Sequence, residues 1–330
     1  MPRQPSVAVE WGLAYEALVG LALFIGGEPE TTYEVGPAWF KAVRRKASPE
    51  LREAARTLVG TEGYSMVGLT GLARESGGRR VADLVARLRA DGSGEVKSAL
   101  LHCDRPMREA LARGDEVAKR EFLKRQPKHL REVMKRSLER DPRDLATGTA
   151  DLVERWDREV FAELGPPLEG ELKASAQSTS RLSHQLPAER LIVKVTRGVE
   201  YRTEPWIDSV VLVPTVLNRP WVDITEHGAT KYLYYPAGRD AAAPDVELVE
   251  VYKALGDETR LRILRLLSTG VTSLSEIAEK LGLAKSTVHG HMVVLRVAGL
   301  TRSIVGGEGK GYVLNDRPDL NSLLDSYLKS

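Results

Sequence analysis

Apolar residues three and four positions apart recur between about residues 7 and 183, the spacing of side chains on one face of an α-helix. Proline or glycine separates these runs, so the pattern predicts a series of distinct helices. The run 129–140 is amphipathic. Its opposite face is basic, and its apolar stripe comprises Leu130, Val133, Met134 and Leu138.

The pattern changes between residues 190 and 236. Short runs rich in Val, Ile and Tyr, separated by Pro, Gly and Asn, predict antiparallel strands; the runs are RLIVKVT, SVVLVPT, PWVDIT and KYLYYPA. The next segment, AGRDAAAPD at 237–245, is small, polar and proline-bearing, which indicates a linker. We therefore expect two domains, a helical and β-strand domain at 1–240 and a second domain at 245–330.

Helical spacing returns after the linker. Residues 248–255 predict one helix, and Asp257 is an expected N-cap for the next, whose predicted core residues are Leu261, Ile263, Leu264, Leu266 and Leu267. Ser273, with Glu276 three positions later, predicts a capping box at the start of a third helix. Gly282 is expected to end that helix.

A further helix is predicted from residue 285 to 298, and Gly299 is expected to end it. Its predicted core residues are Val288, Met292, Val293 and Leu295. The sequence LTRSIVGGEGKGYVLN then predicts a β-hairpin with a glycine-rich turn. Helices followed by such a hairpin predict a winged helix-turn-helix, so the expected fold class is α+β, with a mainly helical N-terminal region, a small antiparallel β region and this C-terminal domain.

Composition bounds the function without identifying it. The chain has 330 residues, of which 42% are hydrophobic and 28% charged, as is usual for soluble globular proteins of two or more domains. The net charge of +2 is too small to demand a nucleic-acid partner. Within residues 280–310, however, five cations accompany one anion: Lys280, Lys285, Arg296, Arg302 and Lys310, against Glu308. Positive charge is therefore concentrated where phosphates would lie.

Polar side chains at the start of the helix 285–298 are suited to the major groove of double-stranded DNA. The expected DNA-binding residues of this helix are Lys285, Ser286, Thr287, His289, Gly290 and His291. Arg302 and Lys310 of the hairpin are expected to contact phosphate or the minor groove. The alternative interpretation is an ordinary helical pair with a solvated polar face.

The motifs LGDETRLRILRLL, EIAEKLGL, STV and VLRVAGL, followed by the glycine-rich hairpin, resemble the winged domain of ArsR-type transcriptional regulators over about residues 246–314. The resemblance implies a DNA-binding regulator that works as a homodimer, with a terminal helix at 320–328 contributing to dimerisation. The family's usual Ser-His-His becomes His289, Gly290 and His291 here, which implies a different operator. VVLVPTVLNRPWVDI and KYLYYPAGR resemble a long subgroup whose N-terminal domain has no settled function.

No metal or cofactor is predicted. The segment TSLSEIAEKLG lacks the Cys-x-Cys that many relatives use, and DLNSLLDSYLKS has no His. His102, Cys103 and Asp104 are adjacent and cannot all face one ion on a regular helix, so Cys103 is interpreted as a core residue. DGSGEVKS at 91–98 lacks the glycine before lysine that a phosphate loop needs, and a surface loop is expected.

The basic run 119–140 contains nine Lys or Arg and three Glu. It is interpreted as a solvated helix face, with an auxiliary phosphate-contacting surface as the alternative. Aromatic residues in the N-terminal region are interpreted as core rather than as a ligand cavity. They include Trp11, Tyr15, Trp39, Phe40, Trp156, Phe161, Trp206 and Trp221.

No catalytic constellation is visible, so an enzyme is not predicted. No apolar run is long enough to span a membrane and no secretory signal is apparent, so a cytoplasmic location is expected. The sequence thus predicts a sequence-specific homodimeric repressor whose N-terminal domain senses a small molecule or partner. An architectural chromatin-type protein without an effector, and an enzyme autoregulated by a DNA-binding tail, remain alternatives. The operator, the effector and the sign of regulation are left open.

Overall fold

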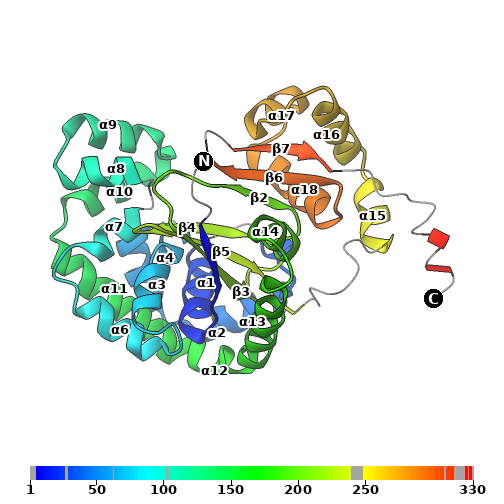
Figure 1. Cartoon of the computed structure of the whole chain (residues 1–330). Helices are drawn as coiled ribbons and strands as arrows, with labels where there is room; N and C mark the ends of the chain where they lie inside the picture. The colour runs from blue at the N-terminus through cyan, green and yellow to red at the C-terminus, as the bar shows by residue number, and fades with distance from the viewer. Residues whose placement is uncertain are drawn as a thin grey trace. The chain divides into compact units, whose positions relative to one another are not determined.

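The computed structural model describes residues 5–26, 29–61, 63–101, 103, 105–238, 248–307, 310–315, 324–325 and 327–328. The chain forms two compact units, shown in Figure 1. Residues 8–176 and 209–238 form the first, here called the helical unit. Residues 1–7, 177–208 and 239–330 form the second, the HTH unit. The predicted linker lies mostly outside the described residues, and the division into domains at 1–240 and 245–330 stays a prediction.

The helical unit is built from short helices, most of them separated by Gly or Pro, as the periodic pattern predicts. They are α1 (Leu13–Ile25), α2 (Gly36–Lys46), α3 (Pro49–Val59), α4 (Tyr64–Val67), α5 (Thr70–Glu75), α6 (Val81–Arg89), α7 (Glu95–Leu101), α8 (Arg105–Ala112), α9 (Glu116–Arg125), α10 (Arg131–Glu139), α11 (Pro142–Trp156) and α12 (Ala162–Leu164). α13 (Glu169–Ser183) continues into the HTH unit.

Helix α1 lies in the core of the helical unit because it is apolar around most of its circumference. Tyr15, Leu18 and Leu21 are all buried. An added Cβ at Gly20 would lie 3.0 Å from Leu217 Cδ1 and 3.1 Å from Trp156 Cζ2. A glycine at this position therefore allows the Leu217 side chain and the Trp156 ring to pack closely against α1.

The sheet of the helical unit has the order β1-β3-β5-β4, with β1 (Ser6–Val9), β3 (Ser209–Thr215), β4 (Asp223–His227) and β5 (Thr230–Pro236). β4 and β5 are antiparallel, but β3 and β5 are parallel, so the prediction of antiparallel strands is only partly correct. The tight β4–β5 connection through Gly228 brings β5 between β4 and β3. All residues of β3 and β5 except the first of each strand are buried, which is typical of parallel strands that are covered on both faces.

One predicted strand is a helix. RLIVKVT contributes to α14 (Ala188–Val195), which follows Pro187. Leu191, Ile192 and Val195 are buried on one face of this helix. Their spacing fits a helical period, whereas a half-buried strand would alternate apolar and polar residues.

The HTH unit contains α15 (Leu248–Leu255), α16 (Glu258–Ser268), α17 (Leu274–Leu281) and α18 (Lys285–Val297). The antiparallel hairpin β6 (Thr301–Gly306) and β7 (Gly311–Leu314) follows, and we call it the wing. β2 (Val199–Arg202) pairs with β6 in parallel, giving the sheet order β2-β6-β7. Figure 1 shows these three strands beside α16, α17 and α18.

Most of the predicted local features of the HTH unit are confirmed. Asp257 caps α16 by accepting the Arg260 N–H at 2.9 Å, and Gly282 adopts φ 66° after α17. Two expectations are wrong. Ser273 precedes α17 without a side-chain cap hydrogen bond, so no capping box forms, and Leu261 is 48% exposed instead of in the core.

Candidate nucleic-acid interface

The first two turns of α18 present polar side chains to solvent. Lys285, Ser286 and Thr287 are exposed, and His289 and His291 are partly exposed. Nothing lies within 4 Å of the position that a Cβ at Gly290 would occupy. The sequence-predicted residues of this helix therefore share one accessible region, and we call α18 the reading helix.

The opposite face of the reading helix is fixed in the core of the unit. Val288, Met292 and Leu295 are at most 1% exposed, and they pack with apolar residues of α16 and α17, including Ile263 and Ile277. The helix begins directly after the turn in which Gly282 takes the left-handed conformation. The polar residues are therefore held by a rigid scaffold, which is what direct reading of base edges needs.

The two predicted wing residues differ in environment. Lys310 is exposed immediately before β7. Arg302 lies partly buried on β6, with its Nη1 atom 3.6 Å from Glu200 Oε2 of β2. Its Nε atom is buried without a hydrogen-bond partner among the described residues. The structure thus leaves Lys310 accessible and brings a carboxylate beside Arg302.

A contact between the reading helix and residues 196–198 was missed by sequence reasoning. Arg296, 3% exposed, donates from Nη1 to the carbonyl oxygens of Thr196 and Arg197, the latter at 3.0 Å. Arg197 in turn donates to the Val297 carbonyl at 3.0 Å and pairs with Glu250 of α15. Burial, together with the nearby charge of Arg197, lowers the pKa of Arg296 to about 10.

The strand after this contact is fastened to the wing. Ser303 N donates to the Gly198 carbonyl at 2.8 Å, and Val199 to Arg202 pair in register with Ser303 to Gly306. Gly198 has φ 105°, and an added Cβ would lie 3.0 Å from Arg296 Cγ. Gly198, which lies between two short apolar runs, was the one sequence signal for a turn before β2. The sequence alone did not identify β6 as the strand that pairs with β2. We call residues 196–202 the brace.

Apolar side chains remain exposed on the outer helices of the HTH unit. Val249 and Tyr252 lie three positions apart on α15, and each is 49% exposed. Leu261 on α16 adds to them. The predicted terminal helix at 320–328 falls mostly outside the described residues. Of the part described, Leu324, Tyr327 and Leu328 are exposed.

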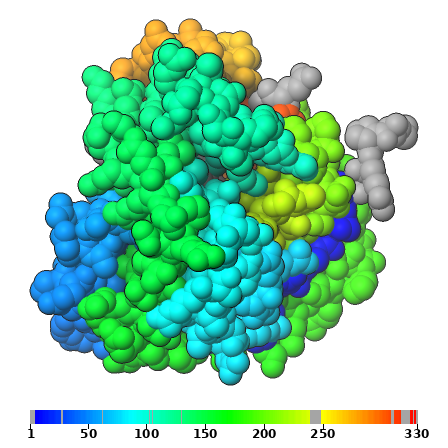
Figure 2. All heavy atoms as spheres, turned by 90° about the vertical axis from the view of Figure 1, so that its left-hand side faces the viewer, coloured from blue at the N-terminus to red at the C-terminus, as the bar shows by residue number. Residues whose placement is uncertain are grey.

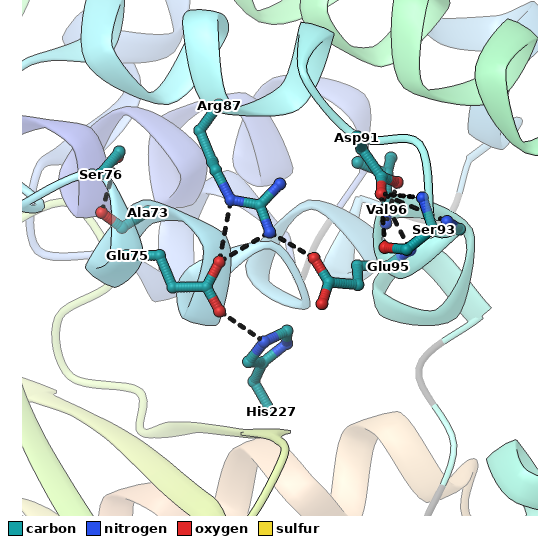
Figure 3. Close-up of polar contacts among 10 residues, drawn as sticks. Ala73, Glu75, Ser76, Arg87, Asp91, Ser93, Glu95, Val96 and His227 are labelled. Carbon is teal, nitrogen blue, oxygen red and sulfur yellow. Dashed lines mark hydrogen bonds and ion pairs between the residues drawn. The ribbon is translucent and has the colours of Figure 1, made fainter.

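The helical unit contains a polar network around Arg87, shown in Figure 3. Arg87 donates from Nε to Glu75 Oε2 at 2.9 Å and also pairs with Glu95, while the other Glu75 oxygen lies 3.1 Å from His227 Nε2. The network joins α5, α6, α7 and the end of β4. We interpret it as a structural link between these elements, since each charged group in it has a partner of opposite charge or a hydrogen bond.

The segment 91–98 is partly a helix. Asp91 accepts backbone N–H groups of Ser93, Gly94 and Val96, as Figure 3 shows for Ser93 and Val96, and α7 begins at Glu95. The expectation of a surface loop is therefore wrong for its second half. The Asp91 carboxylate satisfies N–H groups at the start of α7 in the way that an N-cap does.

Other candidate residues give no further site. Cys103 is partly buried beside an apolar cluster, and its carbonyl accepts Arg108 Nη2 at 2.9 Å; His102 and Asp104 lie outside the described residues. Tyr15, Trp156 and Phe161 are at most 2% exposed, as expected for core residues. In the part of the chain that the structure describes, no group of three or more His, Cys, Asp and Glu side chains is arranged to hold a metal ion.

The reading helix, its rigid support and the wing define a DNA-binding protein of the helix-turn-helix class. Residues 255–304 match a family model described as a helix-turn-helix domain. Over 71 residues the chain is 38% identical to an uncharacterised HTH-type transcriptional regulator, YceK, of Bacillus subtilis (strain 168). That match covers 21% of this chain and 71% of the relative. The chain belongs to the HTH-type transcriptional regulators.

No solved structure matches the chain. Among the described helices, none has the length and apolar character needed to cross a membrane.

Proposed function

We propose that the protein is a sequence-specific, homodimeric repressor of the ArsR type, in which the helical unit regulates the reading helix. The observation that carries the proposal is the position of Lys285, Ser286, Thr287, His289 and His291. These side chains share the accessible part of a helix whose other face is buried. Side chains in that position reach base edges and phosphates when such a helix enters the major groove.

Dimerisation is supported by the exposed apolar residues of α15 and α16. Val249, Tyr252 and Leu261 are each about half exposed, and burial of such residues against a second copy would be favourable. A two-fold dimer presents two reading helices to successive major grooves, roughly 34 Å apart on one face of the duplex. The expected operator is therefore a palindrome.

Regulation is assigned to the helical unit, which we propose acts as a sensor of a small molecule or protein partner and not as an enzyme. A ligand shifts a conformational equilibrium only if it binds the two states with different affinity. The brace offers a route for such a shift, because it contacts Arg296 of the reading helix and is continuous in sequence with β3 of the helical unit.

The test is selection of bound fragments from random double-stranded DNA, followed by affinity measurement on the recovered site. The double variant Lys285→Ala with His289→Ala should lose specific binding and keep its fold, as judged by circular dichroism and thermal unfolding. Lys41→Ala, which removes an exposed lysine of α2 in the helical unit, is the control and should bind as the wild type does.

Undiminished affinity of the double variant for the recovered site would show that the reading helix is misassigned. Recovery of no consensus, with affinity that only collapses as salt rises, would instead favour the architectural alternative. A palindromic site bound far more tightly than bulk DNA would support the regulator.

A further inference from the structure

A second basic surface lies on the helical unit, where α9, the short turn at Lys128–Leu130 and α10 meet. Its residues are Lys124, Arg125, Lys128, Arg131, Lys135 and Arg136, and all six are exposed. Glu132 is the one acidic residue among residues 124–136. We call these six residues the cationic corner. Figure 2 shows the blue-green helices α8–α10 on the surface that faces the viewer.

The corner has a fixed shape. Phe122, Leu130 and Met134 are at most 3% exposed and anchor it from below. Arg131 Nε donates to the Gln126 carbonyl at 3.1 Å, and its Nη2 donates to the Lys124 carbonyl at 3.2 Å. The end of α9 is therefore fastened to the start of α10, and the cations are displayed on an ordered scaffold.

The charges of the corner differ from those of several arginines elsewhere on the unit, which are paired with carboxylates. Exposed arginines of α3 and α6, and the arginine before α6, are paired: Arg56 with Glu53 at 2.8 Å, Arg80 with Asp83 at 2.7 Å, and Arg89 with Glu154 at 2.8 Å. Among the described residues, none of the six cations of the corner has a carboxylate within 4.0 Å.

Helix stability does not explain the arrangement. Lys124 and Arg125 lie in the last turn of α9, where cations are favourable, but Lys128 lies in the short turn directly before α10 and Arg131 is the first residue of α10. Positive side chains there oppose the helix dipole. An ordered, unneutralised cluster that includes unfavourable positions is suited to an external polyanion.

We propose that the cationic corner binds the sugar–phosphate backbone of duplex DNA and adds sequence-independent contacts to those of the reading helix. This inference rests on the proposed function, because the HTH unit in the same chain keeps DNA at high effective concentration near the corner. Each lysine or arginine that neutralises a phosphate displaces condensed counterions, so the contribution is measurable as salt dependence.

The experiment uses the full chain and a random-sequence duplex of about 40 base pairs, roughly four helical turns. Affinity is measured by fluorescence anisotropy over a series of salt concentrations. The corner variant carries Lys124→Gln, Lys128→Gln, Lys135→Gln and Arg136→Gln. The matched control removes four exposed cations elsewhere on the unit, through Lys41→Gln, Arg45→Gln, Arg158→Gln and Lys173→Gln.

The corner variant should bind about tenfold more weakly at low salt. Its slope of log K against log salt should be shallower by about 0.9 for each phosphate that the protein no longer neutralises. The control should keep the wild-type slope. A corner variant that matches the control would overturn the inference, as would weakened binding to phosphatidylserine vesicles with an unchanged DNA slope. Circular dichroism of both variants ensures that the folded proteins are compared.

The Lys285→Ala, His289→Ala variant separates this inference from the proposed function. If that variant loses specific binding while the corner variant behaves as the wild type, only the corner is refuted. If that variant keeps full affinity for the recovered site, the reading-helix assignment fails, whatever the corner does.

Discussion

The Nη1 atom of Arg296 in the reading helix lies 3.0 Å from the carbonyl oxygen of Arg197, a residue 99 positions earlier in the chain. This contact is partly buried, and the neighbouring Thr196 carbonyl, which is buried, accepts from the same nitrogen. The brace is therefore part of the scaffold that sets the position of the reading helix.

Replacing Arg296 with alanine should destabilise the protein by about 2–4 kcal/mol, because the buried Thr196 carbonyl and the partly buried Arg197 carbonyl lose their donor and a cavity forms. Urea denaturation of the full chain gives the change in the free energy of unfolding. Arg265→Ala on the exposed part of α16 should change it by no more than about 0.5 kcal/mol. Equal stability of the two variants would show that the Arg296 contacts do not support the unit.

Replacing Glu200 with glutamine should strengthen DNA binding. Glu200 lies beside both Arg302 and Arg202, at 3.6 Å and 3.3 Å, and its charge offsets theirs. Removal of one negative charge near the wing should raise affinity by a few fold at low salt, with the gain fading as salt screens the interaction. Affinity titrations at two salt concentrations measure the change in DNA affinity. An unchanged affinity at low salt would show that the wing does not contact DNA.

Replacing Gly290 with alanine should have opposite effects on stability and on binding. Alanine favours a helix interior by about 1 kcal/mol over glycine, and the new methyl group has free space. The free protein should therefore unfold at a higher temperature. If position 290 faces a base or phosphate in the groove, specific affinity should fall. Thermal unfolding gives the stability and fluorescence anisotropy gives the DNA affinity of the same samples. An affinity that rises together with stability would show that residue 290 does not contact DNA.

The buried acid Glu16 should give the stability of the helical unit a distinctive pH dependence. Its Oε1 atom accepts the backbone N–H groups of Val216 and Leu217 at 2.9 and 2.7 Å, while Oε2 has no partner among the described residues. Burial raises its pKa from an ordinary value of 4.5 to about 7. Between these values the unfolded chain releases the proton and the folded chain keeps it, so stability falls as pH rises.

The loss should amount to about 3 kcal/mol between pH 4.5 and 7, and it should level off above pH 7. Glu16→Gln keeps an acceptor for the two N–H groups and cannot ionise. The difference in unfolding free energy between variant and wild type should therefore grow in the variant's favour across this range. A constant difference from pH 5 to 8 would show that Glu16 does not titrate there.

The local signals of the HTH unit were readable from sequence because each acts within a few residues. Asp257 before α16 and Gly282 after α17 mark helix ends through their own backbone chemistry. Val288, Met292 and Leu295 reveal the buried face of α18 by their spacing alone. Ser273 shows where prediction from local sequence fails. Its position fits a capping box, but its side chain makes no cap hydrogen bond.

The pairing of strands that are far apart in the sequence could not be predicted in the same way. RLIVKVT has β-branched residues that favour a strand, yet Leu191, Ile192 and Val195 form one buried helical face. The partner of β2 lies about 100 residues later in the chain, and nothing in either strand identifies the other. The pairing of Arg302 with Glu200 follows from that strand pairing, so it was also missed.

The parallel pairing of β2 with β6 bears on how the protein is made. Its first strand leaves the ribosome long before its second, with α15–α18 and much of the helical unit's sheet synthesised in between. Closing such a loop is slow and gains contacts only at the end. The β2 edge of the nascent chain therefore stays unpaired with β6 until the wing emerges, and the complete scaffold of the reading helix forms only after the wing has been synthesised.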